Sequence, residues 1–273
     1  VDDWRGWNFV ANTNDPFDDF GHGTHVAGTI AAVGNNNIGI IGVAPSARIM
    51  GVKGLDANGS GFLDVLANTL VYAANNGAGV INASWGGFGQ TPQTLIDAVN
   101  YAHDVKGVVV VAAAGNNGVD VGSQGSGFFP ANIRNAVTVS AFDHTDTKAS
   151  FSNFGSKIDV GAPGGGDAGV GFDPFRSVLS LLSSGAVSAM TGNGNLIVGT
   201  NYLRQAGTSM AAPHAAGVAA LVRSLHPAWG PEEVRQALRS GSNDVGAPGF
   251  DVQSGYGRLN ALGALSATST LAV

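Results

Sequence analysis

Two short segments of this chain carry the residue types that nucleophilic acyl transfer requires. Ser209 lies between a glycine turn at Gly207 and an alanine-rich stretch typical of a helix start. A helix N-terminus there would offer partial positive charge to a developing oxyanion. His22 stands between two glycines at a second predicted helix start and could take the proton of a neutral serine hydroxyl. The pattern therefore predicts a serine nucleophile with a histidine general base.

Ser209 and His22 also have non-catalytic interpretations. A serine at a helix start is often only a cap for backbone N–H groups. The nucleophile elbow of α/β-hydrolases needs Gly-x-Ser-x-Gly, whereas Ser209 is followed by Met210 and Ala211. His22 and His25 are three residues apart, while a helical zinc pair prefers a spacing of four with an intervening glutamate. Zinc is therefore not expected, and His25 is interpreted as a hydrogen-bonded structural histidine.

Asn116 is the third candidate, because it ends the very apolar run Val111–Ala114 through Gly115. An amide at the end of a buried strand can donate a hydrogen bond to an oxyanion. The alternative is an ordinary turn asparagine in Gly115-Asn116-Asn117-Gly118.

The segments 21–28, 111–116 and 207–214 together resemble the subtilisin family, and the resemblance covers about residues 4 to 265. It implies a serine endopeptidase that forms an acyl-enzyme on Ser209, with His22 as general base and Asn116 in the oxyanion hole. One element of the family is not found. The family order is Asp, His, Ser, and its aspartate lies farther upstream than the 21 residues that precede His22. We therefore expect an N-terminally truncated chain that lacks the first central strand and the catalytic aspartate.

The missing aspartate leaves three explanations open: a partial sequence of an active enzyme, a cleaved chain whose first piece stays bound, or an inactive homologue that binds peptides. The first is favoured, because a pure binder has no chemical use for His22, Asn116 and Ser209 together. As written, the chain is expected to have little activity, since the aspartate orients the imidazole and stabilises its charged form. Substitute carboxylates would have to come from the five acids near the start: Asp2, Asp3, Asp15, Asp18 and Asp19. A remote further possibility is an esterase that uses the same nucleophile.

Substrate binding is expected by strand addition, because a protease must hold extended backbone whatever the side chains. By resemblance, two segments flank the substrate and a third forms the far wall of the primary pocket; these residues are Gly59, Ser60, Gly61, Ser84, Trp85, Gly86, Ala114 and Gly115. The pocket is expected to be roomy and uncharged and to accept large apolar side chains. Ordinary turns are the alternative role of the glycines.

Calcium is the cofactor that the resemblance implies. The family's calcium loop matches the segment 34–45, where the carbonyls of Gly34, Ile38 and Ile40 and the side chain of Asn36 would be hard oxygen ligands. The site's upstream partners are not in this chain, so an incomplete and empty site is expected. Asp15, Asp18 and Asp19 could form another acidic oxygen cluster, but a solvated loop is the favoured interpretation.

Apolar runs along the chain alternate between β-branched and helix-like, which indicates an α/β fold: a three-layer, doubly wound, mostly parallel sheet flanked by helices. Strands are predicted at 48–53, 80–84, 108–112, 136–140 and 158–160, and helices at 62–75, 91–106, 210–225, from 231, and within 260–267. The absent strand would leave a gap between 48–53 and 80–84. Residues 1–273 are interpreted as one peptidase domain with a variable loop at about 164–201.

Composition excludes several other classes. The chain has 273 residues, a net charge of -6 and no cysteine, so disulfides, thiolate sites and a basic nucleic-acid-binding surface are not expected. No apolar run reaches the roughly 18 residues of a membrane span. Extended polypeptides are the expected substrates, a propeptide the expected partner of the precursor, and the family resemblance implies secretion.

Overall fold

Four parallel strands form the centre of the molecule in the computed structural model, which describes residues 6–123, 125–166 and 173–268. These strands, in spatial order, are β3 (Val80–Ala83), β5 (Val109–Ala113), β8 (Ala136–Phe142) and β9 (Ile158–Pro163). Each coincides with a β-branched run that the sequence predicts as a strand. The parallel α/β architecture is therefore confirmed.

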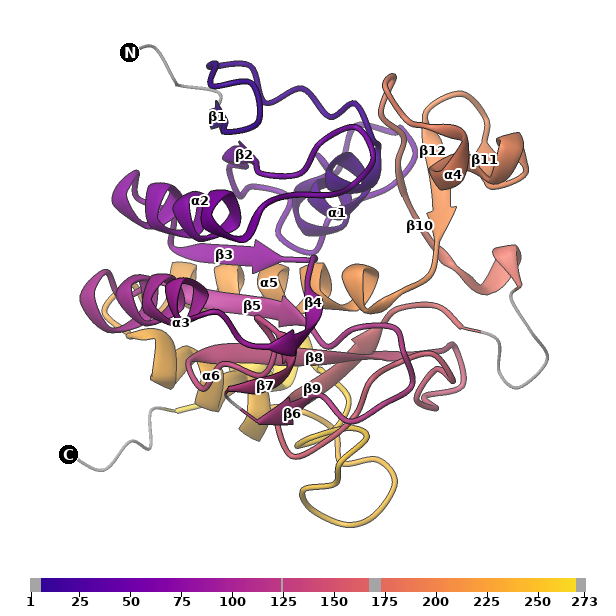
Figure 1. The fold of residues 1–273 in the computed structure, drawn as a ribbon. Helices are drawn as coiled ribbons and strands as arrows, with labels where there is room; N and C mark the ends of the chain where they lie inside the picture. Colours follow the sequence, from indigo (N-terminus) through magenta and orange to yellow (C-terminus); the bar gives the residue numbers. More distant parts are fainter. Residues whose placement is uncertain (1–5, 124, 167–172, 269–273) are drawn as a thin grey trace.

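Strand β5 shows why the fold has three layers. Successive strand residues point to opposite faces of a sheet, and every residue of β5 is buried. Val109 and Val111 pack into one core cluster with the helices α5 (Thr208–Leu225) and α6 (Pro231–Ser240). Val110 packs into another with α2 (Leu63–Asn75) and α3 (Gln93–Asn100). Figure 1 shows α2 and α3 on the near side of the sheet and α5 behind it.

Helix α5 lies deep in the molecule because its residues are small. Alanine and glycine let backbones approach closely, and an added Cβ at Gly217 would lie 2.6 Å from the Cβ of Val43. The helix packs against all four central strands and against α1 (His22–Ala31). Its N-terminal turn, which carries Ser209, is thus fixed by the core. The short helix α7 (Ala261–Leu265) packs beside α6.

A second, two-stranded parallel sheet contains β1 (Gly6–Asn8) and β2 (Gly51–Lys53). Within the described residues it is separate from the four-stranded sheet, so β2 and β3 are not hydrogen-bonded neighbours. That a missing strand belongs between 48–53 and 80–84 stays a prediction. β2 is also shorter than predicted, because only its last three residues pair.

The prediction of a loop at 164–201 is wrong for about half of the described residues in this range. It contains β10 (Val178–Leu181), β11 (Ile197–Val198), the helix α4 (Ser188–Thr191) and the 3-10 turns η2 (Pro174–Arg176) and η3 (Gly192–Gly194). Both strands pair with β12 (Tyr202–Gln205), which lies beyond the predicted loop. The pairing is therefore not visible in the local pattern. Residues 167–172 lie outside the described residues.

An antiparallel ribbon beside the four-stranded sheet completes the set of strands. It consists of β4 (Gly87–Gln90), β7 (Ser126–Phe129) and β6 (Gly122–Ser123). Their glycines hide the usual alternation of apolar and polar residues, and the sequence analysis did not predict them. The helix expected at 91–106 is present but changes at Tyr101 into the π-helical segment η1 (Tyr101–Val105).

Candidate active site

The serine candidate and the segment after β3 hold each other through two hydrogen bonds. Ser209, half-buried in the first turn of α5, donates from its hydroxyl to the carbonyl oxygen of Ser84 at 3.1 Å. The hydroxyl of Ser84 donates in turn to the carbonyl oxygen of Ser209 at 2.9 Å. Asn82 supports the pair, since its Nδ2 donates to the Ser84 hydroxyl at 2.9 Å. The position of Ser209 is therefore tied to the end of the central sheet.

The side chain of Asn116 is held by the buried residue Thr208, which precedes Ser209 in the chain. Its side-chain oxygen accepts hydrogen bonds from the Thr208 backbone N–H at 2.8 Å and hydroxyl at 2.9 Å. The same hydroxyl accepts from the backbone N–H of Gly115 at 3.0 Å. Because the oxygen is occupied, the exposed Asn116 side chain presents its NH₂ group as the remaining donor beside Ser209. Thr208 lies within the segment 207–214, but no role was predicted for it from sequence.

His22 is the first residue of α1, and glycine is required directly before it. Gly21 has φ 105°, and an added Cβ would lie 2.7 Å from the Cβ of Ala186. The Asp18 carboxylate accepts the backbone N–H groups of Gly21 and Thr24 at 2.7 Å each and so satisfies the helix start. Burial lowers the pKa of His22, and the charge of Asp18 acts against that shift. The imidazole is therefore neutral at neutral pH, as a general base must be.

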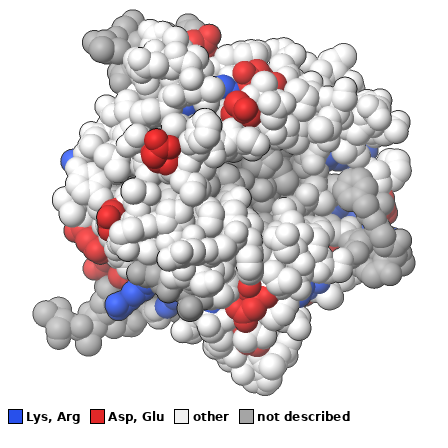
Figure 2. Space-filling model, in the orientation of Figure 1, with Lys and Arg blue, Asp and Glu red and all other residues white. Residues whose placement is uncertain are grey.

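One cavity of about 430 Å³ brings His22 together with most of the predicted substrate-binding residues. Gly59, Ser60, Gly61, Ser84, Trp85 and Gly86 line it, and its apolar walls include Phe20, Leu55, Leu63, Leu66 and Phe129. Figure 2 shows that the middle of this face is hollowed and uncharged, with acidic groups toward the rim. The lining of this cavity does not include Ala114 or Gly115, which are buried.

The place where a roomy primary pocket was expected holds an aromatic ring. An added Cβ at Gly86 would lie 2.5 Å from Cε1 of Phe128, and one at Gly115 would lie 2.9 Å from both Cδ atoms of that ring. Phe128 therefore lies between the two segments that were expected to enclose the pocket. Sequence reasoning missed this residue, whose only local signal is the pair Phe128-Phe129 before Pro130.

The acids of the first loop are engaged elsewhere. Asp15 accepts the backbone N–H of Phe17 at 3.2 Å, and Asp19 pairs with Lys53. Burial acts to raise the pKa of Asp18, but the hydrogen bonds from Gly21 and Thr24 outweigh it and hold that pKa below its usual value. In the part of the chain that the structure describes, no three acidic or histidine side chains are grouped to hold a metal ion. Asp2 and Asp3 lie outside the described residues.

His25 is buried and hydrogen-bonded, as the sequence analysis expects. Its Nε2 lies 3.2 Å from the carbonyl oxygen of Val178 and 3.0 Å from that of Leu203, so this nitrogen carries the proton. Its Nδ1 is buried without a partner. Burial lowers the pKa of His25 to about 4. The side chain thus joins α1 to the neighbouring strands β10 and β12 as a neutral group.

The loop proposed for calcium offers few oxygens. The Asn36 side-chain oxygen accepts the backbone N–H of Ile38 at 3.0 Å, within an exposed turn. Together with the carbonyls of Gly34, Ile38 and Ile40 it would supply four neutral oxygens, whereas calcium takes roughly six to eight. These four residues do not form a complete calcium site by themselves, and calcium binding stays a prediction.

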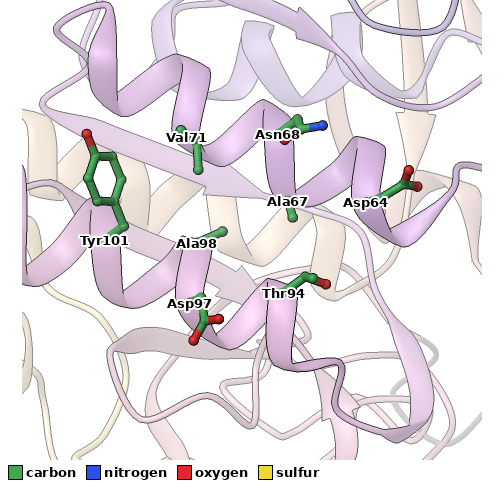
Figure 3. Close-up of a pocket in the computed structure, with 8 residues that line it drawn as sticks. All are labelled: Asp64, Ala67, Asn68, Val71, Thr94, Asp97, Ala98 and Tyr101. Atoms are coloured by element: carbon green, nitrogen blue, oxygen red, sulfur yellow. The ribbon is translucent and has the colours of Figure 1, made fainter.

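A second cavity, of about 410 Å³, lies between α2 and α3 (Figure 3). Asp64 and Asp97 stand at its sides, with Ala67 and Val71 along it. Tyr101 lines one end and donates its hydroxyl to Asn75 at 2.8 Å. Its lining contains neither a serine nucleophile nor a histidine. This cavity is therefore a different site from the one that contains His22.

Within the described residues, none of the helices is both long and apolar enough to cross a membrane.

Comparisons with known proteins agree with this arrangement. A family model described as the subtilase family matches residues 1–257. The chain is 43% identical over 262 residues to the "Thermophilic serine proteinase" of Bacillus sp. (strain AK1), which covers 96% of this chain and 56% of that protein. It is 40% identical to "Subtilisin Savinase" of Lederbergia lenta over 94% of this chain and 81% of that protein. The chain thus spans little more than half of the first relative.

A solved structure supports the same assignment. The crystal structure of a lanthipeptide protease matches with a TM-score of 0.80 and 31% identity, covering 95% of this chain and 80% of that one. The family model, these relatives and the three-layer fold agree: this chain belongs to the subtilase family, whose named relatives here are serine proteinases.

Proposed function

We propose that this chain is the catalytic unit of a serine endopeptidase that hydrolyses peptide bonds of proteins through an acyl-enzyme on Ser209. One observation carries the proposal. The Ser209 hydroxyl is hydrogen-bonded to Ser84, and Ser84 lines the same cavity as His22. Ser209 is thus linked through one residue to the apolar cavity that His22 lines, which supports the roles of nucleophile and base for the two.

The reaction follows from these groups. Ser209 Oγ attacks the peptide carbonyl carbon while His22 takes the hydroxyl proton, and the imidazolium then gives that proton to the leaving amine. Water, deprotonated by His22, attacks the resulting ester and releases Ser209. At rest the hydroxyl proton points to the Ser84 carbonyl, so rotation of the Ser209 hydroxyl toward His22 begins the cycle.

Charge on the carbonyl oxygen would be stabilised by the Asn116 NH₂ group together with the backbone N–H of Ser209. Thr208 supports this role, because it holds the Asn116 oxygen with two hydrogen bonds and leaves the NH₂ group as the outward donor. The N-terminus of α5 adds partial positive charge at the same place.

Extended substrate would lie between Gly59–Gly61 and Ser84–Gly86, where glycines leave room for backbone pairing. The apolar cavity beside these segments would take side chains of the bound peptide.

The carboxylate that orients the imidazole is, in our proposal, none of Asp15, Asp18 or Asp19. Asp18 already binds the helix start, and Asp19 pairs with Lys53. We infer that a strand in the gap between β2 and β3 supplies it, and that residues 1–273 alone turn over slowly. Secretion, a propeptide partner and structural calcium stay predictions of the family resemblance.

Covalent labelling by a fluorophosphonate probe, read as intact mass, tests the proposal, with Ser209→Ala as the control. Labelling of the chain and not of the variant is the expected result. A folded chain that binds peptides but resists labelling would be either an incomplete enzyme or an inactive peptide-binding homologue. Hydrolysis of esters without hydrolysis of peptides would identify an esterase.

A further inference from the structure

We infer that the ring of Phe128 closes the primary specificity pocket, so that the substrate residue whose carbonyl is attacked must be glycine or alanine. This inference rests on the proposed function, because it concerns the substrate of the same site. It names a specificity-determining residue and reverses the sequence-based expectation of a preference for large apolar side chains.

The location of the pocket follows from the contacts of the nucleophile. Ser209 is hydrogen-bonded to Ser84 on one side, and its neighbour Thr208 is hydrogen-bonded to Gly115 and Asn116 on the other. A carbonyl attacked by Ser209 therefore lies between the segments 84–87 and 114–116. The side chain of that substrate residue must enter the space between the same two segments.

The ring of Phe128, which projects from β7, occupies the space between these two segments. Its outer ring atoms face Gly86, where an added Cβ would lie 2.5 Å from Cε1 and 2.8 Å from Cζ. Its inner ring atoms face Gly115, where an added Cβ would lie 2.9 Å from Cδ1 and from Cδ2. The φ angle of Gly86 is not positive, so its backbone conformation does not require glycine. Steric contact does, because an added Cβ would also lie 2.4 Å from the carbonyl oxygen of Phe129.

The ring is held in place and does not act as a flexible gate. Phe128 lies on β7, which pairs with β4 along its whole length. The Phe128 backbone N–H donates to the carbonyl oxygen of Val121 at 2.8 Å. The side chain packs against a buried cluster that includes Ala112, Ala114 and Val121. Moving the ring out would expose apolar surface and leave a void.

The wide cavity near the site lies elsewhere. Its lining includes Trp85 and Phe129 but neither Phe128 nor Gly115. Large apolar side chains therefore find space beside α2, at other positions of the peptide, and not at the residue that is attacked.

Two measurements test the inference. The first compares kcat/KM for two fluorogenic peptide amides that differ only in Ala or Phe at the attacked residue. Because the Phe128 ring leaves no space for a phenyl group at this position, kcat/KM should favour the Ala peptide by at least about tenfold. Phe128→Ala should reverse the preference toward Phe. Phe128→Leu, which keeps more of the packing, should give an intermediate ratio.

The second measurement needs no catalysis. Binding of product peptides that end in Ala or in Phe is measured by calorimetry on the Ser209→Ala background, with and without Phe128→Ala. Phe88→Ala is the matched control, because Phe88 is opposite Phe128 in the ribbon but 62% exposed. This control should leave the preference unchanged.

The outcomes separate the two proposals. A binding preference for Ala that Phe128→Ala reverses, in a chain that never hydrolyses peptides, supports the pocket assignment and overturns the proposed function. Hydrolysis with equal rates for Ala and Phe, or a ratio that Phe128→Ala leaves unchanged, overturns the pocket assignment alone.

Discussion

Ser84 and Ser209 form a reciprocal pair, in which each hydroxyl donates to the other residue's carbonyl oxygen, at 3.1 Å and 2.9 Å. The pair joins the segment after β3 to the first turn of α5. It fixes both the main chain and the hydroxyl of the proposed nucleophile before substrate binds. A substitution at Ser84 should therefore change the position of the Ser209 hydroxyl.

Ser84→Ala removes one of the two hydrogen bonds and leaves the Ser84 carbonyl in place. One hydrogen bond contributes about 1 kcal/mol, so kcat should fall roughly fivefold with KM nearly unchanged. Steady-state kinetics on one peptide amide measures both constants. Asn82→Ala should produce a smaller fall in kcat, because Asn82 acts only through the Ser84 hydroxyl. An unchanged kcat in Ser84→Ala would contradict the positioning role.

Asn116→Ala removes the proposed side-chain donor to the oxyanion. In subtilisin, a member of the same family, loss of such a donor lowers kcat by about 10²–10³-fold, and we expect that range here with little change in KM. Thr208→Val should reduce kcat less, because it loosens the Asn116 side chain without removing it. Asn117→Ala, the adjacent exposed residue, is the matched control and should retain full activity. Equal kcat values for Asn116→Ala and Asn117→Ala would contradict the assignment of Asn116 as an oxyanion donor.

The charge of Asp18 should be visible in the pH dependence of the reaction. His22 must be neutral to act as a base, and burial lowers its pKa below 6.5 while Asp18 acts to raise it. The labelling rate should therefore reach half its maximum below pH 6.5. Asp18→Asn should move that midpoint to lower pH, because the opposing charge is gone. Asp15→Asn, in the same loop, should leave the midpoint in place, and equal shifts in both variants would refute the interpretation.

His25 should make the folded chain sensitive to acid. Its pKa is about 4 in the folded protein against 6.5 as the ordinary value, so between these pH values the unfolded chain binds a proton that the native protein does not. The free energy of unfolding should fall by about 3 kcal/mol as pH drops from 6.5 to 4, and this contribution should not change further below pH 4. Denaturant unfolding at several pH values measures it.

His25→Gln is the informative variant, because its amide can donate to Val178 and Leu203 without titrating. Its free energy of unfolding should depend less on pH over the same window. An unchanged slope in His25→Gln would show that other groups cause the acid sensitivity.

Elements with strong periodicity were predictable from sequence. The buried β-branched run of β5 and the leucine and alanine spacing of α2 indicate their structures locally, and both match closely. The strands β4, β7 and β10 were missed because glycines or short length hide their alternation, and their partners lie far along the chain. Residues 164–201 therefore looked like a loop.

In the candidate site, too, local motifs were predictable and contacts between distant segments were not. His22, Asn116 and Ser209 each stand in a local motif, and the turn chemistry around each is recognisable. The contact between Phe128 and both Gly86 and Gly115 joins three separate segments, so no local pattern reveals it. The sequence analysis therefore predicted an open pocket where the structure places the Phe128 ring.

The residues of the proposed reaction centre lie on two different parts of the fold. Ser84 and Asn116 follow β3 and β5 of the four-stranded sheet, and Ser209 lies in α5. His22 lies in α1, which packs on α5 and on β10 of a separate sheet. Their mutual alignment therefore depends on the packing of α1 against α5, because no strand pairing joins the two parts within the described residues. We therefore expect heating to separate His22 from Ser209 before the central sheet unfolds, so that activity is lost at a lower temperature than the sheet structure.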